Sequence, residues 1–277
     1  MTGTYYTFMP VRNTEKSIQA VIDSLLEQTL PPKEIIVVND GSTDKTGDIL
    51  REYQNSAPVK IITTDSKTRD YTRLVRLWNM CLQRDYDYHM VSPGDTIFQK
   101  DYAEIIVNAM DKDSKLVIAS GNLQTEKAGD PRGAGRFVQQ NFFYKFYKKY
   151  PEIVGYESEI LFKAQIHGYK VFVFDAARFE HVDKLGHKHN FVDFGQGMKA
   201  IGYHPLFVLG RTLNEIKKNG DMGRKGAINM LWNYIKYRPE REGYFSLFPQ
   251  DDRERVRSMQ KRRMWQYVKD AFTRFKE

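Results

Sequence analysis

The chain has 277 residues, and its 43 lysines and arginines outnumber its 35 aspartates and glutamates, giving a net charge of +8. Hydrophobic residues make up 41% of the chain, enough for a substantial core, and this excludes an intrinsically disordered protein. The single cysteine, Cys81, excludes a disulfide framework and a cysteine-based zinc cluster. No segment reaches the roughly 18 apolar residues of a membrane-spanning helix, and residues 1–13 lack a secretory layout, so we expect a cytoplasmic protein.

The first 120 residues alternate short apolar runs with segments of helical periodicity. Asn13 can cap a helix whose apolar residues lie between Ile18 and Leu26, and Pro31 and Pro32 end it. Strands are expected at 5–9, 34–39, 59–63, 88–91 and 116–120, and further helices at 46–54, 72–84 and 100–111. Repeated strand–helix units predict an α/β fold with a mostly parallel sheet flanked by helices. Ligands then bind at the carboxyl ends of the strands.

Beyond residue 120 the pattern is less regular. The sequence predicts helices at 157–167, 191–201, 227–237 and 253–275, a strand at 171–174, and polar loops at 124–135 and 181–190. The aromatic and basic segment 137–150 fits either a membrane contact or a surface helix that buries its aromatic face.

Polar residues follow two of the predicted strands. The first strand runs into Pro10-Val11-Arg12-Asn13-Thr14-Glu15, and the second runs into Asn39-Asp40-Gly41-Ser42-Thr43-Asp44. The ends of adjacent parallel strands converge on one crevice, where the Asp40 carboxylate can accept a hydrogen bond from a uracil or guanine N–H. The structural alternative is a turn at Asp40-Gly41, with Ser42 or Asp44 capping the next helix.

Together these two strings resemble the opening of glycosyltransferase family 2, whose inverting enzymes use a nucleotide-sugar-binding domain of the Rossmann-like GT-A fold. The resemblance runs from about Tyr5 to Arg211. It implies that Pro10, Arg12, Glu15 and Asp40 line the nucleoside pocket. We accordingly expect a GT-A nucleotide-sugar-binding catalytic domain at residues 1–215 and a basic, helical C-terminal extension at 216–277.

The same resemblance places an acidic DXD motif, which holds Mg²⁺ or Mn²⁺ against the donor diphosphate, after the fourth strand. Ser92 and Gly94 occupy the positions of the two usual acids, and Asp95 is the acid of this motif that is left. The resemblance implies that Ser92 and Asp95 contact the donor. Asp95 is the candidate metal ligand, because one carboxylate can bind Mg²⁺ when phosphates supply other ligands. The alternative is a simple turn. The family register adds His181 as a second metal ligand, whereas His187 and His189 fit a solvated basic loop better.

The family also carries an acidic pair about a dozen residues before a Gly-Tyr-Lys string, here Gly168-Tyr169-Lys170. Counting back places Glu157 at the position of the catalytic base. Helical geometry puts Glu157 on the same face as Leu161 and Ala164, which we expect to be buried, with Glu159 pointing away. The alternative is that both acids complement the helix dipole.

The positive charge is concentrated in the C-terminal segment. Residues 253–277 contain nine basic and three acidic residues, hence six of the eight net charges. A basic helix with tryptophan and phenylalanine fits a peripheral anchor on the anionic cytoplasmic face of a membrane. The alternative is a helix packed on the catalytic domain. A nucleic-acid partner is not expected, because the basic residues do not continue across the chain.

The resemblance therefore implies an inverting hexosyltransferase. It would move a sugar from a UDP- or GDP-sugar, with Mg²⁺ or Mn²⁺, to a sugar, glycan or polyprenyl-linked acceptor. The alternative is a nucleotide-sugar-binding protein that lacks transferase activity because the DXD acids are replaced.

Overall fold

A computed structural model describes residues 2–54, 58–65, 72–124, 129–182, 191–218, 222–242 and 248–274. Its strands are β1 (Tyr5–Val11), β2 (Ile35–Asp40), β3 (Val59–Thr64), β4 (Tyr88–Val91), β5 (Thr96–Phe98), β6 (Leu116–Leu123), β7 (Arg136–Gln139) and β8 (Lys170–His181). Its helices are α1 (Ile18–Leu26), α2 (Thr46–Tyr53), α3 (Arg73–Met80), α4 (Tyr102–Lys112), α5 (Gln140–Phe146), α6 (Tyr156–Ile166), α7 (Val192–Ile201), α8 (Pro205–Lys218), α9 (Gly223–Lys236), the 3-10 helix η1 (Pro239–Glu242) and α10 (Gln250–Arg274).

Residue contacts divide the chain into two units. The first comprises Met1–Glu152 and Gly168–Leu185, and the second comprises Ile153–His167 and Gly186–Glu277. The predicted end of the catalytic domain at residue 215 lies inside α8, in the second unit. A catalytic domain that ends there stays a prediction.

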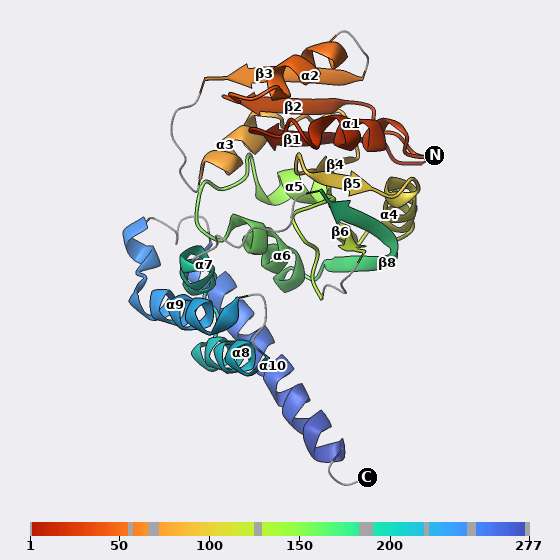
Figure 1. The fold of residues 1–277 in the computed structure, drawn as a ribbon. Coiled ribbons are helices and arrows are strands. Elements are labelled where there is room, and N and C mark those ends of the chain that lie inside the picture. Colours follow the sequence, from red (N-terminus) through yellow and green to blue (C-terminus); the bar gives the residue numbers. More distant parts are fainter. Residues whose placement is uncertain are drawn as a thin grey trace. The chain divides into compact units, whose positions relative to one another are not determined.

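The first unit is built on an eight-stranded sheet with the order β3-β2-β1-β4-β7-β6-β8-β5. Figure 1 shows β3, β2 and β1 side by side in this sheet. β3, β2, β1 and β4 pair in parallel, as does β6 with β8, whereas β7 runs antiparallel to both of its neighbours and β5 antiparallel to β8. The predicted α/β fold with a mostly parallel sheet is confirmed. β4, β1 and β2 are neighbours, so the predicted motif after β1 lies beside those after β2 and β4.

Helices cover both faces of this sheet because side chains alternate along its strands. Tyr5 and Met9 of β1 enter a core with residues of α1 and α4. Tyr6 and Phe8 lie on the opposite face, in an aromatic cluster. Its other members are Trp78, His89, Phe143 and Tyr150, with Phe143 and Tyr150 ring centroids 4.7 Å apart. The segment 137–150 thus contributes a helix that buries Phe142 and Phe143, as the surface-helix alternative predicted.

The second unit is helical and contains a buried ion pair. Its core includes Met198, Ile201, Met230 and Val256. Lys163 of α6 donates to Asp252 of α10 over 2.5 Å, and both side chains are about nine-tenths buried. A buried pair of this kind is strongly destabilising to break, so it fixes α10 against α6.

The N-terminal half of α10 is packed inside the second unit. Val256 and Gln260 are buried, and the Gln260 side chain accepts a hydrogen bond from the His204 amide over 2.7 Å. Arg257 donates to the carbonyl of Gly202 over 3.1 Å. The packed alternative therefore holds for this half, while Trp265 is exposed and the side chains beyond Gln266 lie outside the described part. Among the described helices, none has the length and apolar composition needed to cross a bilayer.

Cys81 is a buried thiol that should resist alkylation. It has no exposed surface and donates to the carbonyl of Leu77 over 3.3 Å. Burial raises the pKa of Cys81 to about 12. Because the thiolate is the reactive species, we expect iodoacetamide at pH 8 to modify the native protein at least tenfold more slowly than the urea-unfolded protein, measured by intact mass. Equal rates would show that Cys81 is accessible in the native state.

Candidate functional site

The segments after β1 and β2 are joined by hydrogen bonds. Asn13 adopts a left-handed backbone with φ of 54°, and its side-chain oxygen accepts from the Thr43 amide over 2.8 Å. The Asn13 amide in turn donates to Ser42 Oγ over 3.1 Å. The prediction that Asn13 caps α1 is wrong, because the N-cap residue is Ser17 and the Asn13 side chain is used to hold the second segment.

Two acidic residues complete this junction. Asp44 accepts from the Glu15 and Thr46 amides over 3.2 and 3.0 Å, and these contacts lower the pKa of its carboxyl against the effect of burial. Glu15, which is exposed, accepts from the Lys45 amide over 3.0 Å. The two predicted motifs therefore form one polar edge. Pro10, also a predicted donor contact, lies in β1 in register with Val38 of β2.

Asp40 is the most constrained acid of this edge. It ends β2, is 5% exposed, and accepts hydrogen bonds from Arg73 Nε over 2.6 Å and from Thr64 Oγ1 over 2.8 Å. Arg73 Nη2 also contacts Asp40 Oδ1. Burial acts to raise the pKa of Asp40, but the hydrogen bonds from Arg73 and Thr64 hold it below its ordinary value. The positive charge of Arg12 acts in the same direction, so Asp40 stays an ionised acceptor.

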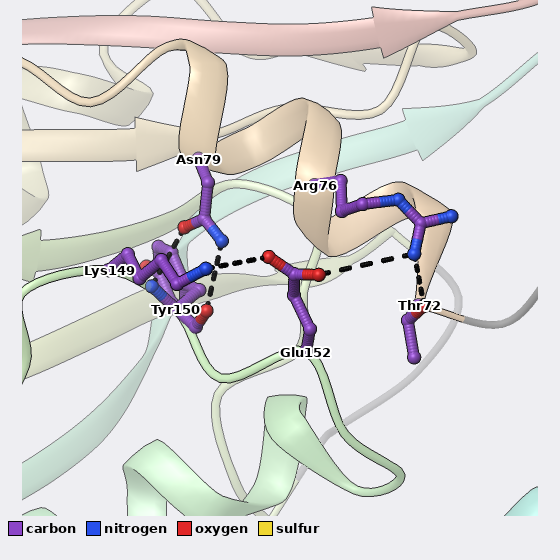
Figure 2. Close-up of polar contacts among 6 residues, drawn as sticks. All are labelled: Thr72, Arg76, Asn79, Lys149, Tyr150 and Glu152. Carbon is purple, nitrogen blue, oxygen red and sulfur yellow. Dashed lines mark hydrogen bonds and ion pairs between the residues drawn. The ribbon is translucent and has the colours of Figure 1, made fainter.

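Arg73 was not among the predicted site residues. It lies at the start of α3, 33 residues after Asp40 along the chain, and no local motif connects the two. α3 is also attached near its other end. The side chain of Asn79 forms two hydrogen bonds with the Tyr150 backbone, over 2.8 and 2.9 Å. Figure 2 shows this contact beside Glu152, which lies 2.9 Å from Lys149 and 4.0 Å from Arg76. This double attachment fixes the helix from which Arg73 reaches Asp40.

The turn after β4 lies against the end of β1. The Ser92 amide donates to the Phe8 carbonyl over 3.0 Å, and Ser92 is 1% exposed. A Cβ added at Gly94 would lie 2.6 Å from Val11 Cγ1, which is closer than packed carbon atoms allow. An aspartate at position 94 would therefore require the Val11 side chain to move, which gives a steric reason for the glycine at this position of the DXD pattern.

Asp95 and His181 come together, as the metal prediction requires. β5 pairs antiparallel with β8, which places Thr96 opposite His181. Asp95 Oδ1 lies 3.5 Å from His181 Nδ1, and Thr96 Oγ1 lies 3.1 Å from the same nitrogen. The Asp95 side chain is 30% exposed, and the His181 side chain is 10% exposed. A carboxylate oxygen and an imidazole nitrogen, both of which can bind a divalent cation, therefore lie close together.

A third protein ligand is not found in the part of the chain that the structure describes, where no group of three or more His, Cys, Asp or Glu residues could hold a metal ion. His187 and His189, together with most of the predicted loop 181–190, lie outside the described residues.

Glu157 lies near the start of α6, in the second unit. Leu161 and Ala164 of this helix are buried as predicted, but the prediction for its two glutamates is wrong, because Glu157 is exposed whereas Glu159 is 1% exposed. The spacing of apolar residues did not reveal this, because the buried side of α6 includes two charged residues, Glu159 and Lys163. Exposure leaves the Glu157 carboxylate open to solvent, and its role as a base is a prediction that the fold does not test.

Comparisons with known proteins give consistent results. Residues 6–185 match the family model described as Glycosyl transferase family 2. A poly-β-1,6-N-acetyl-D-glucosamine synthase of Staphylococcus epidermidis is 27% identical over 113 residues, which cover 40% of this chain and 26% of the relative. The chain thus spans about a quarter of the length of this curated relative.

Two solved structures share the fold. The mannosyltransferase PcManGT of Pyrobaculum calidifontis, in complex with GDP-Man and Mn²⁺, aligns with a TM-score of 0.59 at 14% identity, over 89% of this chain and 75% of its own. S. aureus TarS 1–349 in complex with UDP-GlcNAc aligns with a TM-score of 0.56 at 15% identity, over 91% of this chain and 78% of its own. At these identities, the likeness establishes the fold alone.

Proposed function

Because this chain belongs to glycosyl transferase family 2, we propose that it is an inverting glycosyltransferase that transfers a sugar from a UDP- or GDP-sugar. The observation that carries the proposal is the polar edge at the ends of β1, β2 and β4, with the ionised carboxylate of Asp40 inside it. An open α/β sheet binds ligands at such an edge. The acceptor is a sugar, glycan or polyprenyl-linked molecule.

The remaining hydrogen-bonding capacity of Asp40 supports a nucleobase contact. A carboxylate offers about four lone-pair positions. Arg73 and Thr64 occupy both positions of Oδ1, and Arg73 Nε occupies one of Oδ2. Among the described residues, none occupies the second acceptor position of Oδ2, which suits the N–H of uracil or guanine. Arg12, Glu15 and Pro10 would then surround the nucleoside, and Ser92 would face the donor.

A nucleotide screen tests this donor class. We expect UDP or GDP with Mn²⁺, at about 100 times its Kd, to raise the Tm by about 5 °C, because a ligand bound only to the native state stabilises it. ADP and CDP serve as controls of equal charge and should shift the Tm by less than half as much. Equal shifts with all four nucleotides would show that the base is not read.

The metal proposal rests on Asp95 and His181. Adjacent ligands of an octahedral Mg²⁺ or Mn²⁺ ion lie about 3 Å apart, and the 3.5 Å between Asp95 Oδ1 and His181 Nδ1 is compatible with two of the six positions. Donor phosphates and water would supply the others. The ion would supply charge neutralisation for the leaving diphosphate. PcManGT, a protein of similar fold, is described with Mn²⁺.

Removing either ligand should weaken metal binding. We expect Asp95→Asn and His181→Ala to raise the Kd for Mn²⁺, measured by electron paramagnetic resonance in the presence of UDP, by about tenfold each. Asp85→Asn, which alters an exposed acid of the same unit, is the matched control. Unchanged Mn²⁺ affinity in both ligand variants would reject the site.

In the proposed reaction, Glu157 is the base for a hydroxyl acceptor. The acceptor oxygen attacks the anomeric carbon opposite the nucleoside diphosphate, and its proton passes to the Glu157 carboxylate as the bond to the diphosphate breaks. A polyprenyl phosphate is already an anion and needs no base. The competing function is donor binding without transfer. It predicts that the protein transfers no sugar to any acceptor.

We also propose that the protein is cytoplasmic and peripheral on an anionic membrane face. Within the described part of α10, the exposed Lys261, Arg262 and Trp265 favour such a contact. Deleting 253–277 would also remove Val256 and Gln260 from the core, so Trp265→Ser is the cleaner test. It should weaken binding to anionic vesicles.

A further inference from the structure

Two neighbouring helices of the second unit, α8 and α9, hold large apolar side chains in solvent. Their spacing of three or four residues places each set along one side of its helix. We call this set the α8–α9 apolar surface. Its members are Leu206, Leu209 and Leu213 on α8 and Ile228, Trp232 and Ile235 on α9, which are between 42% and 63% exposed.

The core of the second unit does not use these side chains. α8 contributes Val208 to that core, and α9 contributes Ala227, Met230 and Tyr234. Each helix therefore has an apolar side that is buried and further apolar residues that are not. Single exposed apolar residues are normal, but a row of three along each of two contacting helices indicates a contact surface.

The charges beside this surface are positive. Exposed Lys225 and Lys236 lie at the two ends of the α9 set, and exposed Lys217 follows Leu213 on α8. α9 contains no acidic residue in its sequence from 223 to 236. The centres of protein–protein interfaces are depleted in lysine, whereas lysine beside tryptophan and aliphatic side chains is typical of helices that lie on anionic bilayers.

We propose that the α8–α9 apolar surface binds an anionic lipid bilayer. The six apolar side chains would enter the headgroup region, and Lys217, Lys225 and Lys236 would contact lipid phosphates. The contact goes beyond the proposed transferase reaction, and it does not depend on the C-terminal half of α10. It would confine the enzyme to a membrane surface through helices that belong to the folded second unit.

Tryptophan fluorescence isolates this surface. The chain has three tryptophans, of which Trp78 is buried in the first unit while Trp232 and Trp265 are 61% and 69% exposed. In a Trp265→Phe variant, vesicles of phosphatidylglycerol and phosphatidylcholine should shift the emission of Trp232 to shorter wavelength. Brominated acyl chains should quench it. Pure phosphatidylcholine vesicles should do neither, and high salt should reduce both effects.

A second test compares vesicle binding by two variants. We expect Leu213→Ser combined with Ile228→Ser to lower co-sedimentation with the anionic vesicles at least tenfold. Phe172→Ser, at a 53% exposed site on β8, should leave it within twofold. Circular dichroism verifies that each variant is folded, and omission of nucleotide sugar separates this result from transferase activity.

Three results would overturn the proposal. One is an unchanged Trp232 emission when the protein co-sediments with anionic vesicles, and another is wild-type binding by the double serine variant. The third is a failure of the wild-type chain to bind such vesicles. If the double variant instead dissociated a dimer in sedimentation velocity and retained vesicle binding, the surface would serve a second copy of the chain.

Discussion

Replacing Glu157 by glutamine is expected to lower kcat for a hydroxyl acceptor by about 10²- to 10⁴-fold, the usual contribution of a positioned general base. Donor affinity should stay within twofold, because the amide keeps the shape of the carboxylate and loses only its basicity. Initial rates with a panel of sugar and glycan acceptors measure the first effect, and UDP or GDP titration measures the second. With a polyprenyl phosphate acceptor the rate should be preserved.

Glu159→Gln is the informative companion variant. Glu159 is buried and Glu157 is exposed, so the two acids differ in environment although they lie in the same turn. We expect the glutamine at 159 to lower the Tm and to leave kcat per folded molecule within a few-fold. A large loss of kcat at 159 with none at 157, for a hydroxyl acceptor, would assign the base to Glu159 instead.

Asp40→Asn should weaken binding of the nucleotide donor by at least tenfold. An asparagine retains one acceptor oxygen but turns an amide group toward Arg73, so a charge-assisted hydrogen bond is replaced by two facing donors. Isothermal titration with UDP and GDP measures the affinity. The free energy of unfolding should fall by about 1–3 kcal/mol through the same loss.

Asp48→Asn is the control, since Asp48 is a largely exposed acid on α2 that pairs with Arg51. It should change neither the affinity nor the stability measurably.

Acid should also weaken the Asp40 site. Its pKa is lowered in the native state, so its stabilising contribution is complete above the ordinary pKa of an aspartate and is lost as the pH falls through the lowered value. Equal donor affinity for Asp40→Asn and wild type would remove Asp40 from the pocket.

The strand ends of the first unit could be predicted because their signals are local. β2 reads Ile-Ile-Val-Val before Asn39 and Asp40, and such β-branched runs form buried strands whatever packs on them. The antiparallel insertion of β7 into the sheet has no comparable local signal. Its place is decided by which edge of β4 remains free for pairing, and that depends on the whole topology.

Site contacts across long sequence separations were harder to foresee. Arg73 meets Asp40 only because α3 is fixed on the sheet, and the sequence around Arg73 carries no motif that indicates this pairing. α8 was not predicted although Leu206, Leu209 and Leu213 have helical spacing, and its interior contains Gly210, a poor helix former. α6 was placed correctly, and Leu161 and Ala164 are buried as expected, but Glu157 is exposed and Glu159 is buried, which the residue pattern did not indicate.

The most direct test of the central claim is the release of UDP or GDP from a panel of nucleotide sugars, with Mg²⁺ or Mn²⁺ and candidate acceptors. Wild-type protein should release one of the two diphosphates in proportion to sugar transferred, and Asp40→Asn at equal concentration should release it at least tenfold more slowly at subsaturating donor. Donor binding without release under any acceptor, or release unaffected by Asp40→Asn, would contradict a transferase that acts through this pocket.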